Sequence, residues 1–202
     1  TPVAGTETYT VTGVDMNGCI NYDSLEIVVH PLPTISFTAN DLEGCTPFET
    51  EFTIVSDVEI ATTDWFFGDG GVAPGVTFPT VSHVYEFGGL YDVRATVTDI
   101  YGCVSSVEYD EYITVGPHPI AAFTMSPQSV FTNDTRVDFT NESLHATDYV
   151  WDFADGSPLL NDVNPSHEFP QDPGDVFYPV ELEASNYLGC KDSAILYLQV
   201  KS

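Results

Sequence analysis

A stretch of about 85 residues occurs twice in this chain, and this repeat limits the possible folds more than any other feature. The segment 64–70, Asp-Trp-Phe-Phe-Gly-Asp-Gly, matches the segment 150–156, Val-Trp-Asp-Phe-Ala-Asp-Gly, and their tryptophans lie 151 − 65 = 86 residues apart. Further landmarks keep the same order in both copies: 35–38 and 121–124, 81–85 and 165–169, 89–95 and 176–182, 101–103 and 188–190. We therefore expect two consecutive domains of one fold.

The first 30 residues repeat only the end of this unit. Residues 9–15, followed by Asn17-Gly18-Cys19, match the stretch 91–103, and residues 25–29 match a last strand. We expect residues 1–32 to be the C-terminal hairpin of a truncated domain, residues 33–116 the first full domain and residues 117–202 the second. The linkers 31–33 and 116–119 are short and rich in proline, which makes such segments semi-rigid.

The apolar pattern within each unit has a period of two. Tyr91, Val93 and Ala95 alternate with polar residues, and the stretch 178–184 alternates in the same way. One buried and one solvated face is typical of antiparallel sheets in a sandwich. Turn residues separate these runs, and no long segment has a helical apolar period. The sequence therefore predicts an all-β protein of tandem immunoglobulin-like antiparallel β-sandwiches.

The charge balance excludes two classes of partner. Asp and Glu total 31 against 4 Lys and Arg, a formal net charge of −27. Nucleic acids and anionic membranes both require a basic surface. No apolar run reaches the length of about 18 residues that a membrane helix needs. The acidity suits a protein kept soluble in a salty or calcium-containing medium.

The tryptophan motif predicts core positions. Trp65 and Trp151 are expected between the two sheets; a role as sugar-stacking platforms is the alternative. Asp69-Gly70 and Asp155-Gly156 are expected to close the strand, since Asp accepts hydrogen bonds from turn amides and Gly tolerates positive φ. Phe66 alternates with core positions and should face outward, where a neighbouring domain, a loop or a partner would cover it.

These motifs resemble a known family. Trp-Asp-Phe-Gly-Asp-Gly, then Ser-His-x-Tyr, then Gly-x-Tyr-x-Val is similar to the signature of the PKD (polycystic kidney disease) domain, and the resemblance covers 33–116 and 117–202. Phe66 replaces the usual Asp, and Ala154 replaces a Gly. The segment Asn17-Gly18-Cys19 resembles modules of Bacteroidetes surface adhesins associated with gliding motility. Such proteins typically end in a type IX secretion sorting domain.

Cysteine placement suggests an oxidising compartment. Cys45 and Cys103 lie at places that can be neighbours at one end of a sandwich, and the resemblance to PKD domains favours pairing them. Cys19 matches Cys103, so we expect its partner in the missing start of its own domain. Cys190 has no such counterpart in its unit, which leaves a free thiol or a partner outside the chain.

No catalytic pattern emerges from the sequence. His83 and His167 follow Ser82 and Ser166, but adjacent strand residues point to opposite faces, so structural hydrogen bonding is expected. No cofactor is expected. Calcium remains a possible ligand through Asp64, Asp99 and Asn40, although six to eight oxygens would have to converge.

The segments Asp23-Ser24-Leu25 and Asp192-Ser193-Ala194 resemble the short acceptor motif of Bacteroidetes O-glycosylation. The resemblance thus implies O-glycosylation of Ser24 and Ser193, and chance occurrence is the alternative for so short a motif. Peptide mapping of native material that found both serines bare would remove this expectation.

Two functions agree with these features. The first is a non-catalytic stalk and adhesion module at the bacterial cell surface, which spaces and presents a binding region of a longer polypeptide. The second is a carbohydrate- or protein-binding accessory region of a secreted hydrolase. The second predicts an exposed aromatic platform, to which Phe66, Tyr109, Tyr112 and Tyr149 would contribute. Contacts with other domains of the same polypeptide are expected, and the ligand is unspecified.

Overall fold

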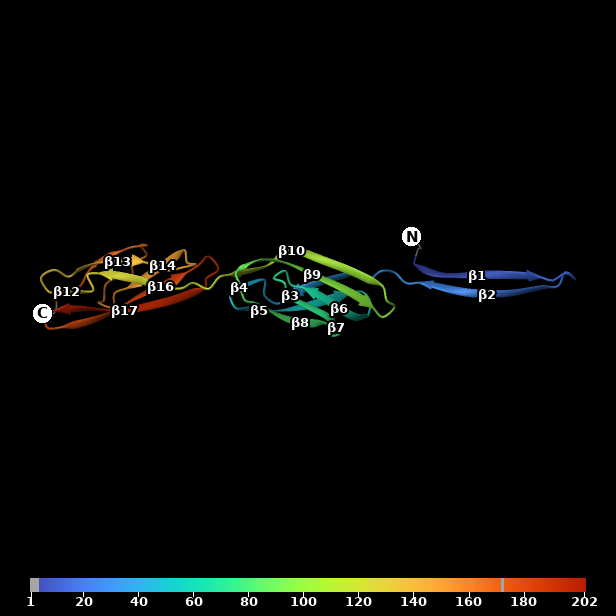
Figure 1. Cartoon of the computed structure of the whole chain (residues 1–202), viewed down its shortest axis with the longest axis horizontal. Helices are drawn as coiled ribbons and strands as arrows, with labels where there is room; N and C mark the ends of the chain where they lie inside the picture. Colours follow the sequence, from blue (N-terminus) through green and yellow to red (C-terminus); the bar gives the residue numbers. More distant parts are fainter. Residues whose placement is uncertain (1–3, 172) are drawn as a thin grey trace. The chain divides into compact units, whose positions relative to one another are not determined.

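The computed structural model describes residues 4–171 and 173–202. Every regular element in this part of the chain is a β-strand, and most pairs of strands are antiparallel (Figure 1). The described residues include no helix of sufficient length and apolarity to cross a bilayer. The predicted all-β, immunoglobulin-like class is confirmed.

The chain begins with an isolated two-stranded hairpin, in blue in Figure 1. Strands β1 (Gly5–Val14) and β2 (Ile20–Val29) pair antiparallel over their full lengths, from Gly5 opposite Val29 to Val14 opposite Ile20. Both faces are exposed, including large apolar side chains such as Val11 and Leu25.

Two sheets form the first sandwich. One has the strand order β3-β5-β8, and the other has the order β4-β10-β9-β6-β7. The bounds are β3 (Ile35–Ala39), β4 (Glu43–Cys45), β5 (Phe48–Ser56), β6 (Ile60–Phe66), β7 (Val72–Val76), β8 (Thr80–Tyr85), β9 (Gly89–Asp99) and β10 (Val104–Gly116).

Aromatic side chains join these two sheets. Trp65 on β6 contacts Phe37 on β3 and Phe52 on β5, with ring centroids 5.2 and 5.5 Å apart. Trp65 is 1% exposed, and Val93, Ala95 and Val97 on β9 are fully buried. Burial of so large an aromatic surface is a main source of stability in such a core.

The second sandwich repeats this arrangement. Its sheets have the orders β11-β13-β15 and β12-β17-β16-β14. The bounds are β11 (Phe123–Ser126), β12 (Ser129–Phe131), β13 (Arg136–Asn141), β14 (Asp148–Asp152), β15 (Ser166–Glu168), β16 (Val176–Ser185) and β17 (Lys191–Lys201). Trp151 on β14 is fully buried against Phe123 and Phe139.

Each sandwich also contains one short parallel strand that the sequence pattern did not predict. In the first, β4 pairs with the end of β10, so that Cys45 lies opposite Gly116. In the second, β12 pairs with the end of β17, so that Phe131 lies opposite Lys201. Phe131 therefore occupies the position in the second sandwich that Cys45 occupies in the first.

The chain divides into two compact units whose bounds differ from the predicted domains. Residues 1–40, 50–83 and 91–112 form one unit, and residues 41–49, 84–90 and 113–202 form the other. Strand β4 and the end of β10 thus belong to the unit that contains the second sandwich. The domain bounds 1–32, 33–116 and 117–202 stay predictions.

One departure from the repeat has an energetic consequence. After the tryptophan strand, the first sandwich has Gly68 at φ +87°, and the second has Ala154 at φ +56°. Left-handed backbone is unfavourable for a residue with a Cβ atom. Alanine at 154 is therefore strained where glycine would not be.

We expect Ala154→Gly to stabilise the second sandwich by about 1 kcal/mol, because relief of the left-handed strain outweighs the added freedom of the unfolded chain. Gly68→Ala should destabilise the first sandwich by more, since its Cβ would lie 2.5 Å from the Asp92 carbonyl oxygen. Urea unfolding followed by tryptophan fluorescence measures both effects. A less stable Ala154→Gly variant would contradict this explanation.

Candidate functional site

A histidine–aspartate pair closes the tryptophan motif in both sandwiches. His83 Nε2 lies 2.8 Å from Asp69 Oδ2, and His167 Nε2 lies 2.7 Å from Asp155 Oδ2. Each histidine ring stacks on the phenylalanine two residues after the tryptophan, Phe67 or Phe153, at 4.0 Å between centroids. The aspartates also accept a backbone hydrogen bond from their own turn, from Gly71 and Ser157. The pairs therefore connect the turn after the tryptophan strand with β8 or β15.

The two pairs differ in burial. The Asp155 side chain is 4% exposed and that of Asp69 is 20% exposed. Burial alone would raise the pKa of Asp155, but hydrogen bonds from His167 and Ser157 outweigh it and lower the pKa below its ordinary value. The ionised carboxylate is therefore stabilised by the fold.

The geometry around the histidines does not provide a nucleophile. Ser82 and Ser166 are not buried, and Ser166 Oγ accepts a hydrogen bond from Arg136 at 3.1 Å. A groove in the first sandwich, lined by residues that include Val58, Val76 and Phe78, contains no titratable side chain. Nothing in these places combines a nucleophile with a base and a group that orients it.

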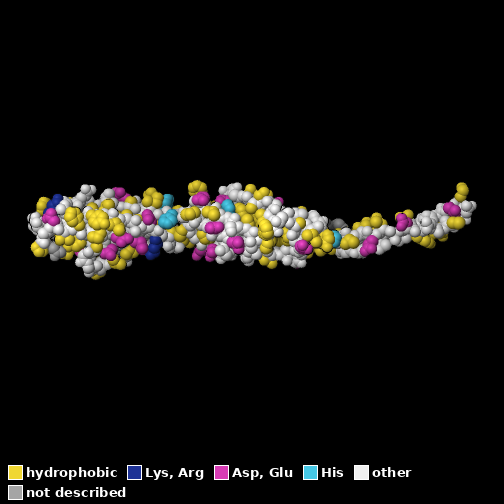
Figure 2. All heavy atoms as spheres, turned by 90° about the horizontal axis from the view of Figure 1, so that it is seen from below, with side chains coloured by type: hydrophobic (Ala, Val, Ile, Leu, Met, Phe, Trp, Pro, Cys, Tyr) yellow, Lys and Arg dark blue, Asp and Glu magenta, His cyan; other side chains and the backbone are white. Residues whose placement is uncertain are grey.

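The proposed calcium ligands have other roles. Asp64 Oδ1 accepts a hydrogen bond from Gly75, Asn40 Oδ1 accepts from Thr50 and Glu51, and Asp99 Oδ1 accepts from Tyr101 and Cys103. Within residues 4–171 and 173–202, no three His, Cys, Asp or Glu side chains gather in a way that could hold a metal. Carboxylates lie scattered over the face shown in Figure 2.

The residues expected to form an aromatic platform mostly pack within the fold. Tyr109 and Tyr112 pack against Phe37, and the Tyr149 hydroxyl donates to the Ala146 carbonyl. Phe66 does face outward, at 38% exposure, and the Arg94 guanidinium lies 4.2 Å from its ring centroid. These four rings do not form one exposed platform.

A turn of one geometry occurs three times and presents a cysteine each time. Residues 15–19, 99–103 and 186–190 share the pattern Asp/Asn-x-x-Gly-Cys. In each, the first side chain accepts hydrogen bonds from two backbone amides, including that of the cysteine, at 2.8 to 3.1 Å. The glycines Gly18, Gly102 and Gly189 have φ between +78° and +83°. We call this element the cysteine turn.

The disulfide of the structure joins Cys45 to Cys190, with Cα atoms 5.7 Å apart, and not to Cys103 as the sequence suggested. The expectation that Cys190 is free or bonded outside the chain is also wrong. Cys19 and Cys103 are free thiols. The physical reason is that β4 runs parallel to the end of β10, which brings Cys45 beside Gly116, while the last cysteine turn packs against Gly116.

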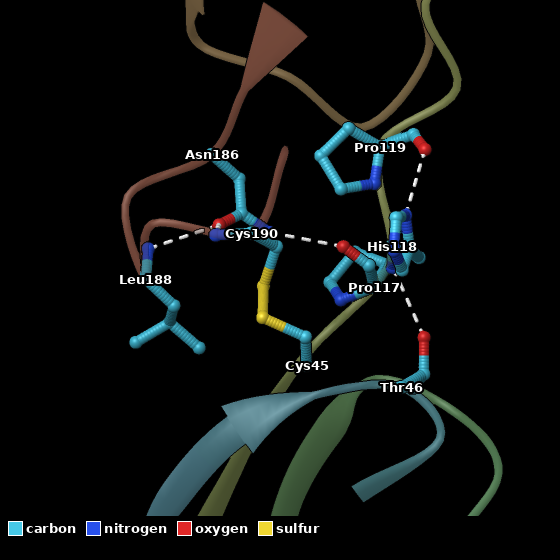
Figure 3. Close-up of a disulfide and its surroundings, with 8 residues drawn as sticks. All are labelled: Cys45, Thr46, Pro117, His118, Pro119, Asn186, Leu188 and Cys190. Atoms are coloured by element: carbon cyan, nitrogen blue, oxygen red, sulfur yellow. Dashed lines mark hydrogen bonds between the residues drawn. A yellow bond between two sulfur atoms is a disulfide. The ribbon is translucent and has the colours of Figure 1, made fainter. Parts of the chain in front are cut away.

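The linker lies close to this last cysteine turn (Figure 3). A Cβ atom on Gly116 would lie 2.9 Å from Leu188 and 3.3 Å from Cys190 Sγ, so only glycine fits there without displacement. Asn186 Nδ2 donates to the Pro117 carbonyl at 2.9 Å, and the His118 amide donates to Thr46 Oγ1 at 3.0 Å. Asp192, two residues after the cysteine, accepts from the Ala121 amide at 2.8 Å. We call this set of contacts the Cys45–Cys190 joint.

The preceding linker makes comparable contacts with its cysteine turn. His30, in the place of Gly116, stacks on Tyr101, in the place of Leu188, at 3.6 Å between ring centroids. Ser105, two residues after Cys103, donates to the Pro33 carbonyl at 2.8 Å. The approach of a linker to the following cysteine turn is therefore a repeated feature.

Sequence reasoning found the Gly-Cys pairs but missed what surrounds them. The Asp or Asn three residues before each glycine is visible in the sequence and signals the turn. The parallel strand β4 has only three residues, and no periodicity could reveal it.

We expect Asp155→Asn to destabilise the second sandwich by about 1.5–3 kcal/mol, since the change removes a charged partner from a buried hydrogen bond. Asp69→Asn is the matched control and should destabilise the first sandwich by less, because Asp69 is more exposed.

The same carboxylate makes stability depend on pH. The folded-state pKa of Asp155 is lowered, so the stability that the Asp155 carboxylate contributes is present above the unfolded-state pKa of about 3.9 and is lost as pH falls through the folded value. Amide hydrogen exchange of β16 and β9 measures the stability of the second and first sandwich separately. Equal losses of stability in the Asp155→Asn and Asp69→Asn variants would contradict the stronger role given to the buried Asp155.

Comparisons with known proteins match part of this chain to one family. The PKD domain family matches residues 28–115. The PKD1 domain of Vibrio anguillarum Epp is 22% identical, covering 42% of this chain and 94% of its own, with a TM-score of 0.35. The PKD1 domain of the Vibrio cholerae metalloprotease PrtV is 20% identical, covering 42% and 99%, with a TM-score of 0.35.

A longer match is the structure of DIP-gamma IG1+IG2, at 13% identity, covering 85% of this chain and 99% of its own, with a TM-score of 0.46. This chain folds into immunoglobulin-like β-sandwiches, and its residues 28–115 match the PKD domain, a common non-catalytic extracellular module.

Proposed function

We propose that this chain is a non-catalytic extracellular spacer in a large cell-surface protein, which holds a binding region away from the surface. The Cys45–Cys190 joint is the observation that carries this proposal. Motion at the joint is restricted in three ways. The Cys45–Cys190 bond links the two segments covalently, position 116 accepts only glycine without displacement of its neighbours, and Asn186 donates a hydrogen bond to the linker. A linker whose motion is restricted by this many contacts suits a spacer more than a hinged clamp.

Other features support an extracellular setting. A disulfide favours an oxidising compartment. The net charge of −27 keeps an exposed surface soluble where counter-ions screen it. Ser24 on β2 is exposed and Ser193 on β17 is not buried, so both agree with the proposed O-glycosylation. We also propose that the protein resides at a bacterial cell surface, is exported by type IX secretion and is associated with gliding motility.

Removing the disulfide should loosen the joint. We expect Cys45→Ser/Cys190→Ser to broaden the distance distribution between non-thiol spin labels at Val55 and Tyr197, which are both exposed. The bond closes a loop with a sequence separation of 145, so its loss should also cost about 5 kcal/mol of stability in the chain-entropy model. Electron–electron double resonance measures the first effect and urea unfolding the second.

The matched control is Cys19→Ser/Cys103→Ser, which removes the two free thiols. This variant should retain the distance distribution of the wild-type chain. An equally broad distribution in the wild-type chain and in the variant without the disulfide would count against a spacer held by this joint.

The alternative, an accessory region of a secreted hydrolase, is supported by one observation. Of the four rings expected to form an aromatic platform, Phe66 faces outward at 38% exposure, and a sugar ring could stack on the part of it that the Arg94 guanidinium, 4.2 Å from the ring centroid, leaves open. Retention of the chain on an insoluble polysaccharide column, lost on Phe66→Ala, would favour this alternative.

A further inference from the structure

The two remaining cysteine turns have the geometry of the one that is bonded. Asp99 holds the amides of Tyr101 and Cys103 at 2.8 Å, as Asn186 holds those of Leu188 and Cys190 at 3.0 and 3.1 Å. The backbone closes equally in both: residue 99 or 186 donates to the cysteine carbonyl at 3.0 Å. Cys103 is thus presented in the same way as Cys190.

The surroundings of Cys103 also match those of Cys190. His30 and Tyr101 take the places of Gly116 and Leu188, and Ser105 holds the linker at Pro33 as Asp192 holds it at Ala121. What differs is the strand beside the linker. In the Cys45–Cys190 joint, β4 pairs parallel with residues 114–116 and carries the partner cysteine. The equivalent residues 28–30, at the end of β2, have no such strand within the described part of the chain.

The hairpin itself indicates what is missing there. In the first and second sandwiches, the strands equivalent to β1 are β9 and β16, whose inward residues, such as Val97 and Leu182, are fully buried. In the β1–β2 hairpin the corresponding apolar side chains are exposed, including Val11 and Leu25. The remaining strands of a sandwich, including an equivalent of β4, would cover them.

We propose that Cys103 forms a second disulfide of the same kind, to a cysteine at the β4 position of the sandwich to which the β1–β2 hairpin belongs. This inference rests on the proposed spacer function and extends it. The bond forms when two thiols lose two protons and two electrons to a disulfide oxidant, which is reduced to its dithiol. Each joint is then closed by a cysteine in the β4 position of one sandwich and the cysteine turn of the next.

The rule assigns a different role to the second sandwich. The second sandwich has Phe131, 58% exposed, at the β4 position, so it supplies a cysteine turn and no cysteine for a following joint. By the same rule, the partner of Cys19 belongs to the sandwich before its own.

A duplication within the full chain tests the geometry directly. Residues 1–115 are followed by residues 30–202, so that a second copy of residues 30–115 follows the first in the native register. The first copy's Cys45 then faces the second copy's Cys103, and the second copy's Cys45 faces Cys190. After refolding in glutathione disulfide buffer, thiol titration in denaturant should find two free thiols among six cysteines, Cys19 and the first copy's Cys103. Four free thiols would overturn the proposal.

Single substitutions identify the partners without peptide mapping. Cys45→Ser in the first copy should raise the number of free thiols from two to three. Cys103→Ser in the first copy should lower it to one, and the same change in the second copy should raise it to three. Any other pattern, such as a bond between the two Cys103 residues, would reject the rule.

The native polypeptide provides the second test. Thiols are blocked with an alkylating reagent before digestion, and the peptide that contains Cys103 is identified by mass. A disulfide to a cysteine on the N-terminal side of residue 1 supports the proposal. Alkylated Cys103, or a bond to Cys19 or to another polypeptide, overturns it. None of these outcomes depends on the width of the distance distribution, so this proposal and the spacer function can fail separately.

Discussion

The burial of one tryptophan between two sheets is the interaction on which the rest of each sandwich depends. Trp65 and Trp151 contact both sheets, and their positions determine which residues of the neighbouring strands face inward. Because β9 and β16 must place an inward row against them, the turns that end these strands have a defined direction. The cysteine turns at 99–103 and 186–190 are therefore positioned by the core, although they lie at its edge.

Much of this core was predictable from the sequence. The period-two alternation of residues 91–97 and 178–184 identified the central strands, and the 86-residue spacing of the tryptophans identified the repeat. Both signals come from side chains that repeat at a regular interval, which is the kind of information a sequence shows directly.

The disulfide was not predictable in the same way. Cys45 lies on a three-residue parallel strand, and Cys190 lies on a turn that packs closely against Gly116 of the linker. Pairing within one repeat unit was the natural expectation, and it failed because the bond joins one copy of the repeat to the next. Such a bond depends on the placement of short irregular segments, for which residue types and spacing provide little information.

The position of the disulfide along the chain determines how the chain would carry mechanical load. Cys45 and Cys190 have a sequence separation of 145, so tension applied at the two ends passes from Cys45 directly to Cys190 through the sulfur atoms. The backbone of the intervening residues, which include most of both sandwiches, would not be extended while the bond is intact, although strands β3 and β17 still transmit load to β5 and β16 through their hydrogen bonds. Fully extended, that segment would add on the order of 500 Å to the length of the chain. The bond therefore acts as a limit on extension, and reduction would release this hidden length.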